Sequence, residues 1–350
     1  MKILFIDSTH LSLKKELKKN GFTCDEDFTS SKAEIEKKLY SYNGIVLRSR
    51  FSIDKTFIDS FLPPLARPDE PFGRGTGRLL FIARVGAGME HIDVAYAESK
   101  GIRCISSPEG NRNAVAEHAL GMLLNLLNNI SKANAEVKAG QWIREPNRGT
   151  ELEAKTIGIY GYGNTGSAFA KVLGGLGVKI LAYDKYRAVC PPLGGGGHDR
   201  GSASVMDGGG LRESSPEEIF SEADILSLHL PLNDETNYLV NDAFISKFKK
   251  NIYLINTSRG PIVKTDDLVK NLKTGKMLGA CLDVLEYEES SFEAVQPETL
   301  NLKPGTNPDW QYLLQSRNVI LTPHIAGWSF ESSEKMARIL AEKVIGLTVR

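Results

Sequence analysis

Three polar side chains with complementary chemistry each follow an apolar stretch of the chain. Arg259 ends the segment INTSR, Glu288 lies in LDVLEYEE, and His324 ends LTPH. An imidazole titrates near neutrality and can take a proton from an alcohol, and a carboxylate bound to it would fix its tautomer. A guanidinium binds a carboxylate with its planar fork. Such a set could oxidise a 2-hydroxy acid if a hydride acceptor is present. Each residue also has a structural interpretation: an ion pair for Arg259, a solvated loop acid for Glu288, and a core histidine for His324.

A glycine-rich turn indicates where the acceptor would bind. The segment GYGNTG stands between an apolar run and a helical pattern, and a second apolar run ends just before Asp184. Gly161 permits a sharp turn, Gly163 lets the backbone approach a pyrophosphate, and Gly166 lets helix and strand pack closely. The helix N-terminus offers unpaired N–H groups to phosphate. Asp184 would accept hydrogen bonds from ribose hydroxyls and repel a 2′-phosphate, so we predict a site for NAD rather than NADP.

The elements that must position these residues are alternating strands and helices. Strand-like runs read KILFI, GIVLRS, LLFIARVG and IRCIS in the first hundred residues, and ADILSLHL, NIYLINTS, LGACLDV and NVILTPH later. This alternation predicts an α/β fold with two Rossmann-like domains, each a doubly wound parallel sheet, and a cleft between them. We expect a flavodoxin-like substrate domain at 1–106 and 326–350, and an NAD-binding domain at 107–325. The strand ends are where ligands bind such sheets.

Three other stretches have distinct patterns. Residues 63–78 predict an exposed loop, and residues 187–214 are so rich in glycine that they predict a mobile excursion in which His198 is exposed rather than catalytic. Residues 113–128 form a helical pattern that is apolar on more than one face. That helix would be buried between domains, form a subunit interface, or do both.

Composition excludes several classes of protein. The 350 residues carry 43 basic and 43 acidic side chains, so net charge gives no reason to expect a nucleic acid or a membrane as a partner. No apolar run is long enough to span a bilayer, and the amino terminus is typical of a first strand rather than a signal peptide, which favours a cytoplasmic protein. The four cysteines are scattered, so we expect reduced thiols and no metal site.

Taken together, the motifs resemble those of the D-isomer-specific 2-hydroxyacid dehydrogenases. The segments GYGNTG, HLPL, INTSRG, LDVLEYEE and TPHIAG occur in the family's order, and the resemblance covers most of the chain from Val85 onward. It implies an NAD-dependent oxidoreductase with Arg259, Glu288 and His324 as the catalytic residues. It also implies a homodimer.

The resemblance further implies which residues contact the ligands. The cofactor contacts would be Ala87, Gly161, Gly163, Asn164, Thr165, Gly166, Asp184, Leu230, Thr257, Ser258, Asp283, Ile325, Ala326 and Gly327. The substrate contacts would be Arg48, Ser49, Val85, Gly86, Arg259 and His324, of which Val85 and Gly86 would cradle a carboxylate with backbone N–H groups.

Within the family, LRSRFSIDKTFID and PEGNRNAVAEH look most like the 3-phosphoglycerate dehydrogenases. A phosphorylated substrate needs positive charge at its far end, and Arg48, Arg50 and Arg112 could supply it, because arginine binds phosphate bidentately. The alternative is that these arginines are surface charges.

The chain departs from the family pattern at several points. Glu289 stands where the family has proline, which predicts a less rigid loop after Glu288, and Arg187 beside Asp184 could soften the preference for NAD. The two irregular stretches have no family counterpart. Because the sequence ends with the last helical pattern, we expect no carboxy-terminal serine-sensing domain and no feedback inhibition through one.

The leading hypothesis is therefore oxidation of 3-phospho-D-glycerate to 3-phosphohydroxypyruvate, the entry to serine biosynthesis. An alternative in the same class is reduction of glyoxylate or hydroxypyruvate. An alternative of another class is an NAD-sensing binding protein such as a corepressor, although no peptide-docking motif is evident.

Overall fold

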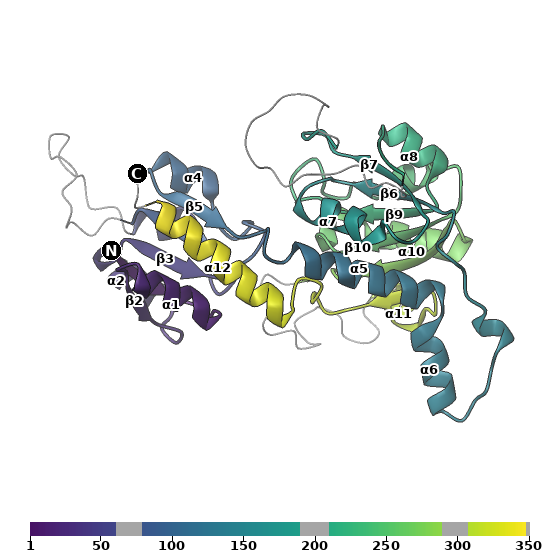
Figure 1. Cartoon of the computed structure of the whole chain (residues 1–350), viewed down its shortest axis with the longest axis horizontal. Coiled ribbons are helices and arrows are strands. Elements are labelled where there is room, and N and C mark those ends of the chain that lie inside the picture. Colours follow the sequence, from purple (N-terminus) through teal and green to yellow (C-terminus); the bar gives the residue numbers. More distant parts are fainter. Residues whose placement is uncertain (61–78, 190–209, 289–306, 348–350) are drawn as a thin grey trace. The chain divides into compact units, whose positions relative to one another are not determined.

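The computed structural model describes residues 1–60, 79–189, 210–288 and 307–347. These residues form two compact units, each with its own parallel sheet (Figure 1). Unit 1 contains Met1–Asn111 and Trp328–Arg350, and unit 2 contains Arg112–Glu289 and Val295–Gly327. The chain passes from unit 1 to unit 2 between Asn111 and Arg112 and returns between Gly327 and Trp328.

Unit 1 has a five-stranded sheet in the order β2-β1-β3-β4-β5, which is the order of flavodoxin. Its strands are β1 (Lys2–Phe5), β2 (Thr23–Glu26), β3 (Gly44–Leu47), β4 (Phe81–Arg84) and β5 (Arg103–Ser106). Its helices are α1 (Leu11–Lys19), α2 (Lys32–Lys38), α3 (Lys55–Asp59), α4 (Val94–Ser99) and α12 (Phe330–Gly346), with a 3-10 turn η1 (Leu39–Ser41). Helices α1 and α12 pack together over one face of the sheet, and residues of α2, α3 and α4 pack on the other (Figure 1).

Unit 2 has a seven-stranded sheet in the order β12-β11-β10-β9-β6-β7-β8, which is the Rossmann order with one strand added. Its strands are β6 (Thr156–Tyr160), β7 (Lys179–Tyr183), β8 (Leu211–Glu213), β9 (Ile225–Leu228), β10 (Ile252–Asn256), β11 (Met277–Leu282) and β12 (Val319–Leu321). Its helices are α5 (Arg112–Leu127), α6 (Ile130–Lys138), α7 (Asn164–Leu173), α8 (Pro216–Glu222), α9 (Asp242–Ser246), α10 (Thr265–Thr274) and α11 (Pro308–Gln315), with 3-10 turns η2 (Glu145–Asn147) and η3 (Gly260–Ile262). Helices α5 and α7 cover one face, and α8 to α11 cover the other (Figure 1).

The predicted fold class is confirmed, because both sheets are parallel and covered by helices on both faces. The central strands are buried on both sides, as their uniformly apolar sequences indicated; all four residues of β9, for example, are buried. The apolar pattern after Ser329 forms α12, which packs in unit 1.

Two edge strands were not predicted. Strand β2 reads TCDE and pairs only with β1, so it needs no apolar signature. Strand β8 lies within the stretch 187–214 that the glycine content assigned to a mobile excursion; that prediction is wrong for Leu211–Glu213, which pairs with β7. Residues 190–209, including His198, and residues 61–78 lie outside the described residues.

Helix α5 covers the helical pattern predicted at 113–128. Most of its apolar side chains are buried inside unit 2, where the helix packs against α7 and β11 and where Ala116, Ala119 and Leu123 belong to the core. Helix α6 follows directly and has no buried residue at all. None of the helices in the described ranges combines the length and the apolar character that crossing a bilayer requires.

Candidate active site

The three candidate catalytic residues lie in unit 2 beyond three neighbouring strands. Strands β10, β11 and β12 are adjacent and parallel, and Arg259, Glu288 and His324 follow them in that order. The carboxyl ends of parallel strands share one edge of the sheet, so the topology brings the three loops to the same edge. The loops after β10 and β11 approach each other closely at Gly260, where a Cβ would lie 1.8 Å from the carbonyl oxygen of Leu285.

His324 and Glu288 are in direct contact. The Nδ1 atom of His324 lies 2.7 Å from Oε2 of Glu288, and the other carboxylate oxygen accepts a hydrogen bond of 2.6 Å from the backbone N–H of Leu285. An ionised carboxylate only accepts, so Nδ1 carries the proton in this contact, and Nε2 is the ring nitrogen that does not face Glu288. Both side chains are partly exposed. Glu288 thus fixes the orientation and the tautomer of the imidazole. Glu289, whose position predicted a less rigid loop, lies outside the described residues.

The turn that carries His324 is built around the buried carboxylate of Asp283. That carboxylate is 1% exposed and accepts hydrogen bonds from the backbone N–H groups of Ile325, at 2.9 Å, and Ala326, at 2.8 Å. The N–H of His324 donates to the backbone carbonyl of Asp283 at 2.8 Å. His324 has φ +54°, a left-handed conformation that a side chain with a Cβ adopts only when its surroundings hold it. Asp283 and its partners supply that support.

The glycine turn after β6 has the form that a dinucleotide needs. Gly161 has φ +97°, and a Cβ there would lie 2.3 Å from the carbonyl oxygen of His229. A Cβ on Gly166 would lie 2.1 Å from the carbonyl oxygen of Gly161, so α7 can approach β6 only at glycine. Gly163 precedes α7 without any side-chain cap, and Asn164 and Thr165 begin the helix, so its first N–H groups are presented to a ligand.

Asp184 stands at the end of β7 and helps to shape the same turn. One carboxylate oxygen accepts a hydrogen bond from the N–H of Tyr162 at 2.7 Å, and the other accepts from the N–H groups of Tyr186 and Arg187 at 2.9 and 3.0 Å. The guanidinium of Arg187 lies 4.0 Å from the place where a Cβ on Gly163 would be. Arg187, which from its position beside Asp184 was expected only to affect the cofactor preference, thus also lies at the glycine turn.

The loops after β9 and β10 complete this edge. Ser258 Oγ donates to the carbonyl of Leu228 at 2.6 Å and accepts from the N–H of Leu230 at 3.1 Å, so these two loops are joined. Thr257 Oγ1 is buried and has no hydrogen-bond partner among the described residues. A buried hydroxyl without a partner is costly, and a polar ligand at this edge would satisfy it. The glycine cradle, the uncapped helix and this hydroxyl therefore fit a dinucleotide.

The predicted substrate contacts Arg48, Ser49, Val85 and Gly86, together with Ala87, lie in unit 1 at the ends of β3 and β4. Two residues that no motif singled out, Asp7 and Arg84, hold these loops. Asp7 Oδ2 accepts the backbone N–H groups of Arg48 at 2.6 Å and Ser49 at 3.1 Å. Arg84 donates from Nε to the carbonyl of Arg48 at 2.9 Å and from Nη1 to that of Gly88. The sequence feature that could have indicated them is a charged residue at the end of an apolar run, in FID for Asp7 and in FIAR for Arg84.

The arginines proposed for phosphate differ in their surroundings. The guanidinium of Arg48 lies over the ring of Trp328, 4.3 Å from its centroid. Arg50 instead donates to the backbone carbonyls of Ile6, Asp27 and Ser30, which gives it a structural role. Arg112 is exposed at the start of α5.

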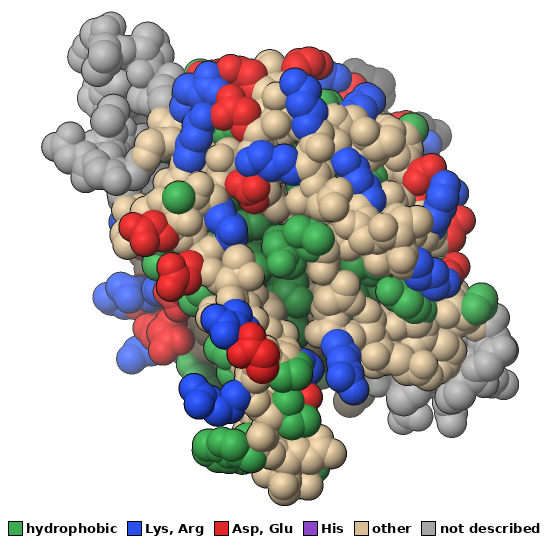
Figure 2. All heavy atoms as spheres, turned by 90° about the vertical axis from the view of Figure 1, so that its right-hand side faces the viewer, with side chains coloured by type: hydrophobic (Ala, Val, Ile, Leu, Met, Phe, Trp, Pro, Cys, Tyr) green, Lys and Arg blue, Asp and Glu red, His purple; other side chains and the backbone are tan. Residues whose placement is uncertain are grey.

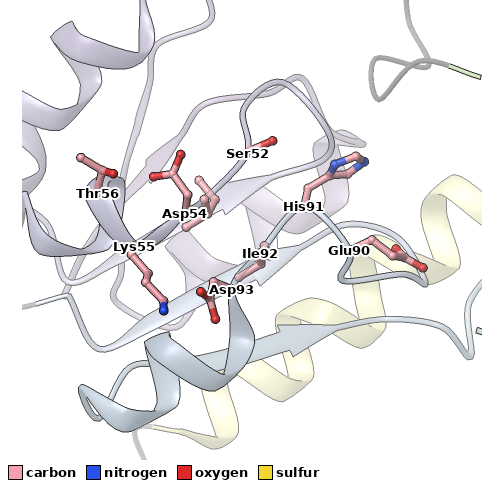
Figure 3. A pocket seen from close by; sticks show the side chains of 9 residues that line it. Ser52, Asp54, Lys55, Thr56, Glu90, His91, Ile92 and Asp93 are labelled. Carbon is pink, nitrogen blue, oxygen red and sulfur yellow. The ribbon is translucent and has the colours of Figure 1, made fainter. Parts of the chain in front are cut away.

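An open pocket of about 490 Å³ lies in unit 1, and none of the candidate residues lines it (Figure 3). It is lined by Ser52, Ile53, Asp54, Lys55, Thr56, Glu90, His91, Ile92 and Asp93. Its two aspartates already cap helices, since Asp54 accepts from the N–H of Phe57 and Asp93 from that of Tyr96. The pocket therefore gives no indication of a catalytic centre.

Comparison with known proteins identifies the family. Residues 120–326 match the model of the D-isomer specific 2-hydroxyacid dehydrogenase, NAD binding domain. The chain is 34% identical over 278 residues to a glyoxylate reductase of Thermofilum pendens, an alignment that covers 77% of this chain and 72% of that protein. It is 30% identical over 322 residues to D-3-phosphoglycerate dehydrogenase 2, chloroplastic, of Arabidopsis thaliana, covering 92% of this chain and 44% of that protein.

The chain spans about half the length of the phosphoglycerate dehydrogenases that it matches. Among solved structures, the TT0316 protein of Thermus thermophilus is similar with a TM-score of 0.74 and 25% identity, covering 100% of this chain and 97% of that one. The family prediction is thus confirmed, and with it the NAD-binding domain. The chain belongs to the D-isomer-specific 2-hydroxyacid dehydrogenases, a family of NAD-dependent oxidoreductases that act on the CH–OH group of their donors.

Proposed function

We propose that the chain oxidises a D-2-hydroxy acid with NAD, and that its substrate is 3-phospho-D-glycerate, which yields 3-phosphohydroxypyruvate for serine biosynthesis. The observation that carries the proposal is the 2.7 Å contact between His324 and Glu288 at the strand edge that also carries the glycine turn. An imidazole oriented by a carboxylate is the proton acceptor that alcohol oxidation needs.

In this mechanism, His324 Nε2 takes the hydroxyl proton as the C–H bond at the same carbon is broken. NAD, when bound, would supply the acceptor for the hydride that leaves this carbon. Glu288 stabilises the imidazolium through Nδ1, and Arg259 holds the substrate carboxylate and polarises the carbonyl in the reverse reaction. The predicted cofactor contacts, including Thr257, Ser258 and Asp283, would hold the nicotinamide side. Asp184 would bind the adenosine ribose and favour NAD over NADP.

A phosphate group on the substrate is supported by Arg48. Stacking on Trp328 fixes the plane of its guanidinium, and a fixed planar fork suits a phosphate. The relatives named phosphoglycerate dehydrogenase point the same way. The similarity to a glyoxylate reductase supports an unphosphorylated 2-oxo acid as the second candidate substrate.

The test follows NADH absorbance with a panel of phosphorylated and unphosphorylated 2-hydroxy and 2-oxo acids, repeated with NADPH. We expect turnover of 3-phosphohydroxypyruvate with NADH. His324→Ala should lower kcat by at least about a hundredfold, as expected for loss of a general acid and base, while His10→Ala, an exposed histidine, should not. Arg48→Ala should raise KM selectively for the phosphorylated acid, with the exposed Arg338→Ala as its control.

Equal effects of Arg48→Ala on both kinds of acid would favour glyoxylate or hydroxypyruvate as the substrate. Tight NADH binding without turnover of any acid would favour an NAD-sensing binding protein.

We also propose a homodimer that uses α6 and the segment after it. Helix α6 buries none of its residues within the chain, although Ile130 and Val137 are half exposed and Trp142 beyond the helix is 81% exposed. Figure 2 views the side of the molecule on which α6 lies in Figure 1, and hydrophobic side chains reach the surface there among charged ones. A second copy of this chain would cover them.

A further inference from the structure

His118 on α5 reaches the loop that follows β12. Its Nε2 atom lies 3.0 Å from Oγ1 of Thr322 and 3.5 Å from Oδ1 of Asp283. This histidine ends the segment PEGNRNAVAEH, whose pattern assigns it no role. The structure thus brings an imidazole from a distant helix to the buried carboxylate that supports the His324 turn.

The donor and the acceptor in each of these hydrogen bonds follow from which groups carry a proton. The carboxylate of Asp283 accepts only, and the single hydroxyl proton of Thr322 points to it across 2.6 Å. The alternative acceptor, the sulfur of Met122, lies 3.7 Å away and is weak. Thr322 Oγ1 must therefore accept from His118, so Nε2 of His118 carries a proton and donates. The result is one directed chain from His118 through Thr322 to Asp283.

This chain ends on the turn that carries His324. The Asp283 carboxylate binds the N–H groups of Ile325 and Ala326, and its backbone carbonyl binds the N–H of His324. Hydrogen bonds in series polarise one another in a buried setting, so the first donor strengthens the last contact. The backbone carbonyl of Thr322 also accepts a hydrogen bond of 3.0 Å from the N–H of His324.

We propose that His118 is a positioning residue, which holds the His324 turn in place through Thr322 and Asp283. The proposal rests on the proposed role of His324 in proton transfer. It assigns His118 no contact with substrate or cofactor.

The kinetic test compares His118→Leu, which removes the donor, with His118→Gln, which keeps a donor near the position of Nε2. Loss of one hydrogen bond in a charged network should lower kcat about tenfold in His118→Leu, with KM for the acid changed less than about twofold because substrate binding uses other residues. His118→Gln should recover most of kcat. Gly121→Ala on the same helix is the control, since a Cβ there meets nothing within 4 Å.

A double-mutant cycle tests the route. Thr322→Val should give the same loss as His118→Leu, and the double variant should be no slower than either single variant, because both remove one chain of contacts. The proposal would be overturned if the two single losses of kcat multiplied in the double variant. It would also be overturned if His118→Leu kept the wild-type kcat, or if His118→Gln recovered none of the loss.

Hydrogen–deuterium exchange supplies a readout that needs no turnover. The peptide containing Ile325 and Ala326 should exchange faster in His118→Leu and Thr322→Val than in the wild type, and at the wild-type rate in His118→Gln. If the wild type turns over no acid, the proposed function fails, whereas the exchange rates still decide whether His118 holds this turn. Unchanged exchange in both loss variants would refute that role.

Discussion

At the scale of single residues, environment separates histidines that the sequence alone cannot rank. His324 is partly exposed and bound to a carboxylate, whereas His229 is buried with its ring nitrogens 2.9 Å from Ser227 Oγ and 3.2 Å from Thr165 Oγ1. Burial lowers the pKa of His229 to about 3, because a charged imidazole would lose its hydration. His229 therefore stays neutral and serves to fix Thr165 beside the glycine turn.

This burial predicts a specific loss of stability in acid. Below pH 6.5, His229 is protonated in the unfolded chain but stays neutral in the folded chain. The free energy of unfolding therefore decreases as the pH falls from 6.5 toward 3. Between pH 7 and pH 5 the group should cost the wild type about 2 kcal/mol of unfolding free energy. In urea unfolding at the two pH values, the free energy of unfolding of His229→Gln should decrease less than that of the wild type, because the glutamine does not titrate.

His10→Gln serves as the matched control, because His10 is exposed on the surface of unit 1. It should keep the wild-type pH dependence. An equal pH dependence in His229→Gln and the wild type would contradict the prediction.

At the scale of elements, the close contact of α7 with the end of β6 decides the shape of the cofactor site. The helix begins directly at Asn164, and the packing leaves no room for a side chain at Gly166. The same strand edge receives the loops after β9 and β10, which Ser258 joins through hydrogen bonds to both sides.

Gly166→Ala should therefore weaken NADH binding. The new Cβ would lie 2.1 Å from the Gly161 carbonyl oxygen, so the helix or the turn must shift. Overpacking of this kind costs about 1–3 kcal/mol, and we expect a lower melting temperature together with at least about tenfold weaker NADH binding by fluorescence titration. Gly175→Ala beyond the end of α7 is the control, because its Cβ meets nothing within 4 Å. Wild-type NADH affinity in Gly166→Ala would show that the turn adapts.

At the scale of the whole molecule, each unit has its own core and its own set of candidate contacts. Unit 2 contains the glycine turn and the catalytic candidates, and unit 1 contains Arg48 and the loop after β4. The chain segment that returns to unit 1 begins just after the His324 turn, and its first residue, Trp328, stacks on Arg48. The residue proposed to bind phosphate is thus supported by the segment that follows His324 in the chain.

The proposed homodimer gives a prediction at this scale. Light scattering after size-exclusion chromatography should report two copies for the wild type. A charge placed in the exposed apolar face, as in Val137→Asp, should shift the mass toward one copy, because an unpaired carboxylate in an apolar interface is costly. Leu11→Asp is the matched control, since Leu11 is 81% exposed on α1. A monomeric wild type, or an effect of Leu11→Asp equal to that of Val137→Asp, would remove the proposal.

Much of the fold could be predicted because the strongest signals are local. The uniformly apolar central strands and the helical pattern of α12 follow from short stretches of sequence, and the glycine turn follows from backbone conformations that only glycine adopts at low cost. The edge strands β2 and β8 gave no such signal, because a strand paired on one side can be short and polar. Because β8 is only three residues long and follows a glycine-rich segment, the local composition indicated a mobile stretch there.

What the sequence by itself determined was the family, the α/β fold class, and the residue types that alcohol oxidation requires. Only the tertiary structure decided which residues support them. Asp7 and Arg84 hold the loop that begins at Arg48, and Arg50 donates to backbone carbonyls. His118 contacts Thr322 although more than two hundred residues separate them. The physical reason is that a hydrogen bond depends on distance and direction, which strand order and helix packing set and which no local pattern records.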